Sequence, residues 1–274
     1  MSDQEAIQQF AKMMQREDEE INLAEAALLI ARTEYPELDL PRHLARLESM
    51  AGQITTDPGR SDIGNILALN EFLFEREKFS GNEDEYDDPR NSFLNDVLDR
   101  KKGIPITLSL VYMELARRNG LPVWGVSFPG HFLVKYAADS GEIIIDPFNQ
   151  GAVMTRQDCD ERLKSNFGED AEFRSEFLDA ATNKQILSRM INNLKGTYFR
   201  RRNYPRVLRM IEMGQAIDPG SREELRDRGM VHLLMGHYAE ARADLTTCAA
   251  LSPPDDPGLK EINTALARLR ALVN

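Results

Sequence analysis

Residues 101–123, KKGIPITLSLVYMELARRNGLPV, form the stretch around which the rest of the chain is expected to fold. Pro105 suits the first turn of a helix, where its missing N–H is not needed. Apolar side chains then recur at helical spacing up to Leu115, and the Asn119-Gly120 pair is a typical left-handed helix end. The stretch therefore predicts a helix that starts near residue 105 and is apolar enough to lie in the core.

The pattern changes to strands after this helix. Three short runs rich in β-branched and aromatic residues follow: VWGVSF (123–128), HFLVKYA (131–137) and EIIIDPF (142–148). The segment ADSG separates the second run from the third and is a hairpin signal. Folding the hairpin about this turn brings His131, at the start of its strand, opposite or nearly opposite Asp146. We expect a small antiparallel sheet packed against the helix.

Upstream of the central helix, helical spacing of apolar residues predicts further helices over 4–16, 20–33, 40–54 and 62–79. His43 is interpreted as an ordinary helix-surface residue. The acidic stretch 83–88 lacks the ligand spacing and central glycine of a calcium loop. It is interpreted as a solvated loop that ends at a short helix, with Asn91 or Ser92 as the cap.

The C-terminal part of the chain contains a repeat. Tyr204 and Tyr238 lie 34 residues apart, and so do Pro219 and Pro253, with a helix-turn-helix pattern between them. This period is typical of tetratricopeptide repeats, and the final helix is expected to cap the stack. His232 and His237 are assigned to the helical framework, and Cys248 to a small packing position in the core.

Charge divides the chain in the same way. Residues 1–182 carry a net charge of −16 and residues 183–274 carry +5, which sum to −11. We therefore predict two domains, 1–182 with its N-terminal helices and 183–274 with the repeats. The tail is too weakly basic to favour nucleic acid, and the apolar runs are too short to span a membrane. No signal peptide is recognised, so a cytoplasmic location is expected, and neither a cofactor nor a metal is predicted.

His131 and Asp146 are the residues with the clearest catalytic potential. A carboxylate held against a ring N–H fixes the histidine tautomer and supports general-base chemistry. Such a pair still needs a nucleophile, and the N-terminus of a helix packed on the sheet suits a thiol, because the helix dipole lowers its pKa. Pro105 stands at that place, and the two cysteines, Cys159 and Cys248, lie elsewhere in the chain.

Taken together, these features resemble the papain-like transglutaminase core, whose helix opens with a motif such as R-x-G-V-C that carries the cysteine nucleophile. KKGIP matches the opening, NGLPV the helix end, His131 the histidine and Asp146 the aspartate before a proline. From about residue 20 onward the chain is similar to the bacterial SirB-type family, transglutaminase-like proteins with a tetratricopeptide tail. The resemblance implies an α+β fold followed by helical repeats, with Pro105 at the position of the nucleophile.

Two functional hypotheses follow from this comparison. In the first, the chain is a non-catalytic interaction or regulatory module, His131 and Asp146 are vestigial, and the tail binds a protein or peptide. An acidic partner would suit its arginines, which are Arg200, Arg201, Arg202 and Arg206. The alternative is an acyl transferase or an amide or ester hydrolase that uses His131 and Asp146 with a non-cysteine nucleophile. Tyr86, Arg90 and Asn91 could line its cleft or form a loop-packing network instead, and Gly103 and Gly130 are further candidates for the cleft.

Overall fold

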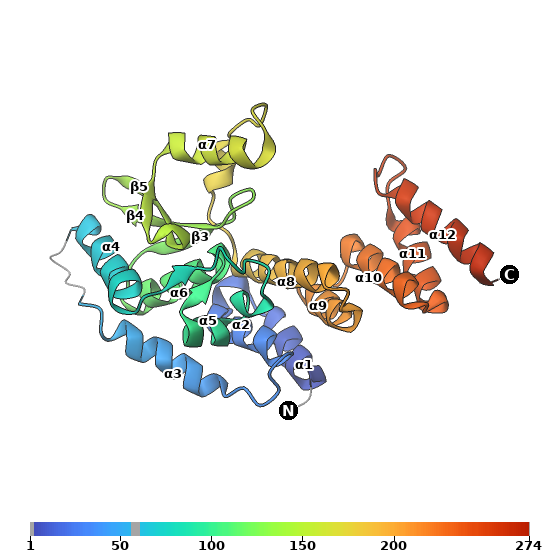
Figure 1. Ribbon diagram of the computed structural model, residues 1–274, viewed down its shortest axis with the longest axis horizontal. Coiled ribbons are helices and arrows are strands. Elements are labelled where there is room, and N and C mark those ends of the chain that lie inside the picture. Colours follow the sequence, from blue (N-terminus) through green and yellow to red (C-terminus); the bar gives the residue numbers. More distant parts are fainter. Residues whose placement is uncertain (1–2, 56–60, 274) are drawn as a thin grey trace. The chain divides into compact units, whose positions relative to one another are not determined.

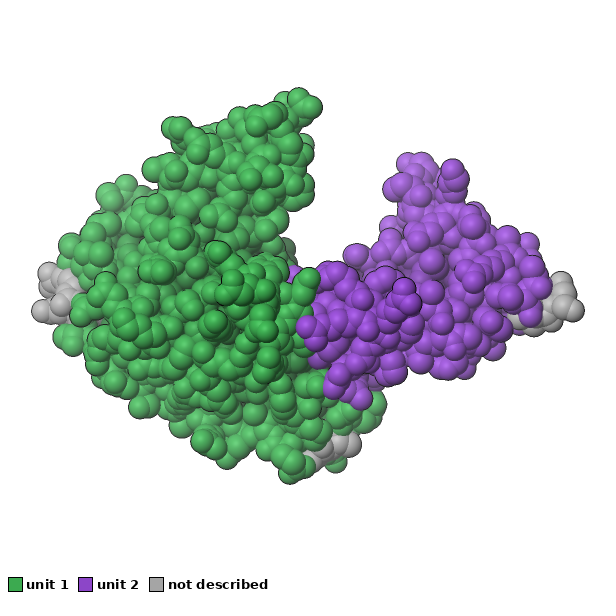
Figure 2. Space-filling model, viewed as in Figure 1, with its two compact units in different colours: residues 1–190 green, residues 191–274 purple. Residues whose placement is uncertain are grey.

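The computed structural model describes residues 3–55 and 61–273 and divides the chain into two compact units, 1–190 and 191–274 (Figures 1 and 2). The first unit combines helices with a small antiparallel sheet, and the second is entirely helical in its described part. The predicted fold class, α+β followed by a helical repeat tail, is confirmed. No helix within the described ranges is long and apolar enough to cross a membrane.

The main sheet of the first unit has four antiparallel strands in the order β3-β4-β5-β6. Their bounds are Val123–Val126, Leu133–Ala138, Gly141–Asp146 and Ala152–Met154. The predicted hairpin forms between β4 and β5, with Val134 opposite Ile145. The sequence did not predict β6, and His131 lies two residues before β4 instead of at its first residue. A separate parallel pair joins β1 (Ser80–Gly81) to β2 (Lys102–Gly103).

Helix α6 (Pro105–Arg118) is the predicted central helix and packs against β3 and β4 (Figure 1). Every residue from Pro105 to Ala116 is buried, so the helix is covered all round and not only along one stripe. At its start, the Thr107 hydroxyl donates to the Asn91 carbonyl (2.7 Å) and accepts from the Ile104 N–H (3.1 Å). At its end, Gly120 has a φ of 68°, the left-handed conformation predicted there.

The N-terminal helices of this unit follow the predicted spacing. They are α1 (Asp3–Met14), α2 (Leu23–Arg32), α3 (Leu40–Ala51), α4 (Asp62–Asn70) and a π-helical continuation of α4 (Glu71–Arg76). The side chains of Asn22, Asp39 and Ser61 cap α2, α3 and α4. The surface assignment of His43 is wrong: its side chain is buried, and burial lowers its pKa.

The short helix before α6 begins later than expected. Helix α5 (Leu94–Arg100) has Phe93 at its N-cap, without a side-chain cap hydrogen bond. The prediction that Asn91 or Ser92 caps it is therefore wrong. Asn91 is the last residue of a preceding 3-10 helix (Pro89–Asn91) and Ser92 follows as its C-cap, while the carboxylate of Asp88 caps the start of that helix.

Two further helices complete the first unit. Helix α7 (Arg156–Phe167) contributes Cys159 and Leu163 to a core cluster with side chains of the sheet region, namely Val126, Phe128, Leu133 and Ile144. Helix α8 (Asn183–Arg200) begins in this unit and continues into the next. The carboxylate of Asp18 caps α8, because it accepts from the backbone N–H groups of Asn183 (2.7 Å) and Lys184 (2.9 Å).

The second unit contains the repeats, in helices α9 (Tyr204–Ile217), α10 (Arg222–Met235), α11 (Tyr238–Leu251) and α12 (Leu259–Val273). Helices α9 and α11 begin at the two tyrosines that define the period of 34 residues. A Cβ atom added to Gly229 would lie 2.7 Å from Leu245, so only glycine allows this approach of α10 to α11. Cys248 is buried beside Ile262, as predicted for a core thiol.

Candidate functional site

His131 and Asp146 lie in direct contact within the first unit. The Nε2 atom of His131 is 2.9 Å from Oδ1 of Asp146. The histidine is 6% exposed and the aspartate is fully buried. Because an ionised carboxylate only accepts, this geometry requires the imidazole proton to be on Nε2, which leaves Nδ1 as the basic nitrogen of the neutral ring.

Asp146 has further partners that occupy both of its oxygens. Its Oδ1 also accepts from the backbone N–H groups of Phe148 (3.1 Å) and Asn149 (3.3 Å), in the 3-10 helix that follows β5. Its Oδ2 accepts from Nη2 of Arg162, on α7, at 3.1 Å. The carboxylate therefore caps a turn and balances the charge of an arginine in addition to orienting the histidine.

Arg189, on α8, fixes the backbone around His131. Its Nη2 donates to the His131 carbonyl at 2.6 Å, and its Nη1 donates to the Phe128 carbonyl (2.9 Å) and the Ser127 hydroxyl (2.8 Å). The guanidinium also lies 5.6 Å from the ring centroid of Phe132. Burial lowers the pKa of Arg189. Three acceptors on one turn mean that the loop carrying His131 is held rigidly.

Phe148 separates His131 from Tyr86. The centroid of the Phe148 ring is 6.0 Å from that of His131 and 6.2 Å from that of Tyr86, both edge-on. A Cβ atom added to Gly81, in β1, would lie 2.6 Å from the same ring. Tyr86 is half-exposed, and burial of its inner part raises its pKa. Of the candidate cleft residues, Tyr86 thus approaches the histidine through an intervening phenylalanine.

The other candidate cleft residues have local partners. Asn91 is fully buried, accepts from the amide of Asn82 (3.0 Å) and donates to the Glu85 carbonyl (2.7 Å). Arg90 is on the surface and pairs with Asp88 at 2.7 Å. This arrangement supports the loop-packing network that the sequence left as an alternative.

The two candidate glycines occupy tight positions. A Cβ atom on Gly103 would lie 2.8 Å from the hydroxyl of Thr107. Gly130 has a φ of 69°, and a Cβ atom there would lie 2.7 Å from the amide of Asn166. Both glycines therefore allow close packing next to the start of α6 and next to His131.

Nucleophilic groups are poorly placed in this unit. Pro105 is buried at the first position of α6 and has neither a reactive side chain nor an N–H. Cys159 is fully buried on α7, and burial, assisted by the charges of Asp158 and Asp146 and opposed by Arg162, raises its pKa. A buried neutral thiol is a core residue and a poor nucleophile. Within the described ranges, no three histidine, cysteine or carboxylate side chains gather as a metal site would require.

The arginines of the second unit lie near the junction of α8 and α9. Arg200, Arg201 and Arg202 are exposed. The guanidinium of Arg206 lies 5.5 Å from the ring centroid of Tyr198. Sequence reasoning missed Arg162, Arg189 and Phe148, which surround the histidine pair, because no motif distinguishes them from other residues on their helices or turn.

Two family models and several curated proteins match the chain. A model described as the transglutaminase-like superfamily matches residues 40–192, and one described as a tetratricopeptide repeat matches residues 194–273. A UPF0162 protein of Xylella fastidiosa (strain 9a5c) is 38% identical over 86% of this chain and 86% of its own length. A UPF0162 protein of Vibrio cholerae is 29% identical over 91% of this chain and 93% of its own length.

A more distant similarity is confined to part of the chain. The human protein named F-box only protein 21 is 31% identical over 46% of this chain and 20% of its own length. The superfamily match spans more than half of the present sequence, and the Xylella relative is similar over most of both chains. The chain therefore belongs to the transglutaminase-like superfamily and to the UPF0162 proteins.

Proposed function

We propose that this chain is a non-catalytic transglutaminase-like protein of the SirB type, which acts in the bacterial cytoplasm as a protein-interaction or regulatory module. The observation that carries the proposal is Pro105, buried at the first position of α6, where the resemblance to the superfamily places the nucleophilic cysteine. Neither Cys159 nor Cys248 substitutes for it, because both are buried in apolar clusters.

The electrostatics of the histidine pair support the same proposal. An aspartate that assists a catalytic histidine stabilises the imidazolium formed during the reaction. Here Asp146 already balances Arg162 at 3.1 Å, so less of its charge is available to His131. The pair is also almost inaccessible to solvent, and Arg189 fixes the turn beside it. In this proposal His131 and Asp146 hold strands and turns together, with a purely structural role.

The absence of catalysis is tested with full-length protein and a panel of amide and ester substrates. We expect wild type and the His131→Ala variant to give the same background rate, because no thiol is available for the histidine to activate. The matched control is His43→Ala, which removes the buried histidine of α3. Turnover that falls by about 100-fold or more in His131→Ala alone would overturn the proposal in favour of acyl transfer or hydrolysis.

We further propose that the repeat unit binds an acidic protein or peptide near the end of α8. Arg200, Arg201 and Arg202 are exposed there, and Arg206 stacks on Tyr198 nearby. Tetratricopeptide stacks present surfaces that bind peptides, and clustered arginines suit carboxylate groups.

Acidic synthetic peptides test this surface on the full-length protein. We expect the double variant Arg201→Glu, Arg202→Glu to bind them about two- to tenfold more weakly than wild type, since each exposed ion pair contributes modestly. The control is Arg242→Glu, Arg270→Glu, which makes the same charge change at exposed positions of α11 and α12. Equal losses in both variants, measured by isothermal calorimetry, would contradict a specific surface at the end of α8.

A further inference from the structure

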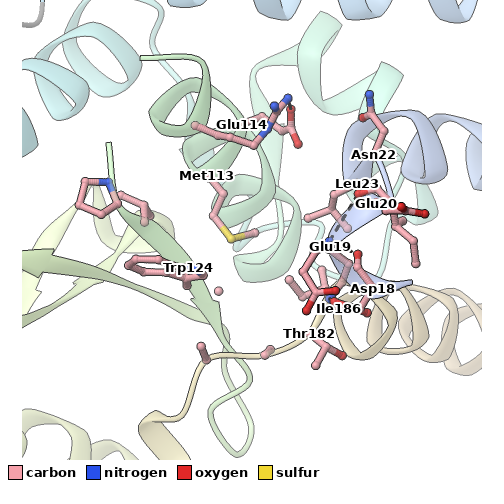
Figure 3. A pocket seen from close by; sticks show the side chains of 18 of the residues that line it. Asp18, Glu19, Glu20, Asn22, Leu23, Met113, Glu114, Trp124, Thr182 and Ile186 are labelled. Atoms are coloured by element: carbon pink, nitrogen blue, oxygen red, sulfur yellow. Dashed lines mark hydrogen bonds and ion pairs between the residues drawn. The ribbon is translucent and has the colours of Figure 1, made fainter. Parts of the chain in front are cut away.

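The first unit contains a concave feature away from the histidine pair. It is a cavity of about 700 Å³, within the range of small-ligand and peptide pockets. Its walls come from β3, α6, the start of α8 and the 3-10 helix Asp18–Glu20 that precedes α2 (Figure 3). Every residue that lines it belongs to the first unit.

One wall of this pocket is apolar and includes Trp124, the single tryptophan of the chain. Its side chain is 45% exposed, whereas Met113 and Ile186 beside it are buried. Figure 3 shows Met113 between Trp124 and the opposite wall. An indole ring left accessible at the edge of an apolar cavity can pack against the aliphatic stem of a long side chain or against a cation.

The opposite wall is acidic. Asp18, Glu19 and Glu20 line it from the 3-10 helix, and Glu114 and the single basic lining residue, Arg117, come from α6. Arg117 pairs with Glu114 at 3.1 Å, a carboxylate that also pairs with Arg118, and Asp18 caps α8. Glu19 and Glu20 are exposed and form no ion pair with any other described residue. The pocket therefore combines an aromatic wall with two carboxylates that are available to a ligand.

We propose that this pocket binds a lysine or arginine side chain, presented beside an apolar residue in a basic segment of a partner protein. The aliphatic stem packs on Trp124, the cationic group lies toward Glu19 and Glu20, and the neighbouring apolar residue contacts Met113. The chemistry of the two walls selects this occupant, because an acidic segment would be repelled by the carboxylates and a purely apolar one would leave them unused.

A partner is expected to bind at this edge of the sheet through its side chains and not by adding a strand to β3. β3 is the edge strand, but the Gly125 carbonyl already accepts from the Ala181 N–H at 2.8 Å. A β-bridge between Val126 and Ala180 covers the same edge. The backbone of the chain itself thus occupies the position that an added strand would need.

The proposal deepens the proposed interaction function, because it gives the first unit a ligand class of its own. Trp124 makes the test direct: with no other tryptophan in the chain, its emission reports on this pocket alone. Full-length protein is titrated with short synthetic peptides that carry lysine or arginine beside leucine, and with matched peptides in which glutamine replaces each cation. We expect the cationic peptides to shift the emission and the glutamine peptides to leave it unchanged.

The variant Glu19→Gln is expected to weaken binding about two- to fivefold, with a further loss at high salt. Its matched control is Glu17→Gln, which changes the same charge two residues earlier, outside the pocket lining. Trp124→Ala should weaken binding by a similar factor, measured by anisotropy of a labelled peptide. The proposal is overturned if no peptide shifts the emission, or if Glu19→Gln and Glu17→Gln bind alike. This readout is independent of His131-dependent turnover, so either proposal can fail alone.

Discussion

Replacing Asp146 by alanine is expected to lower the free energy of unfolding of the first unit by about 3–5 kcal/mol. The fully buried carboxylate accepts from His131, from Arg162 and from two backbone N–H groups. Its removal leaves buried donors without an acceptor and takes the cap from the 3-10 helix after β5. Urea titrations monitored by Trp124 emission measure this unit specifically, because the only tryptophan lies in β3.

The matched control for this substitution is Asp160→Ala on α7. Asp160 pairs with Lys164 at 2.7 Å on the surface, so its loss should cost less than about 1 kcal/mol. A difference of less than 1 kcal/mol between the two variants would show that the Asp146 network is not structural. Catalytic residues are often held at a cost to stability, so an increase in stability of Asp146→Ala would instead favour the enzyme hypothesis.

In the second unit, Lys195→Met should lower the free energy of unfolding by about 3 kcal/mol at neutral pH. The Lys195 ammonium lies 2.9 Å from Glu224 and 2.8 Å from Asp227, and both Lys195 and Glu224 are buried. Without the lysine, two neighbouring carboxylates face each other at a partly desolvated site. Native-state hydrogen exchange of amides in α10, which carries both acids, measures the loss.

The effect of pH on this network follows from the two pKa shifts. Burial alone lowers the pKa of Lys195, but Asp227 and Glu224 outweigh it and raise that pKa, so the lysine's contribution is present below about pH 10 and is lost as pH rises further. Burial raises the pKa of Glu224, and without the opposing lysine it rises more. Lys195→Met should therefore regain stability as pH falls and Glu224 takes up a proton.

The control for the lysine is Lys260→Met, at an exposed position of α12. This variant should unfold within about 0.5 kcal/mol of wild type at every pH. A loss in Lys195→Met that does not shrink toward acidic pH would contradict the role assigned to the two carboxylates.

The elements with strong periodic patterns were predictable from the sequence. Pro105 and Asn119-Gly120 delimit α6 because each has a backbone preference that suits its place in the helix. The alternating runs around ADSG were sufficient to bring His131 beside Asp146, although β4 starts two residues after the histidine. A strand of three residues such as β6 is too short to show an alternation of apolar and polar residues in the sequence. It is stabilised by its pairing with β5.

The residues around the histidine were not predictable because they come from distant segments. Arg162 on α7 donates to Asp146, and Arg189 on α8 donates to the His131 carbonyl. Sequence spacing does not say which arginine of a helix faces the site. The predicted cap of α5 was wrong for a related reason. Asn91 has a favourable side chain for a cap, but its amide oxygen already accepts from the Asn82 amide at 3.0 Å.

The cap that Asp18 places on α8 has a consequence for the order of folding. Its carboxylate accepts from the backbone N–H of Asn183, a partner 165 residues further along the chain. Closing so long a loop is slow and entropically costly, so this contact is expected to form late. During synthesis, this cap cannot form until Asn183 and Lys184 have left the ribosome, and a chain cut after residue 182 loses both of the cap's partners and the arginine that holds His131.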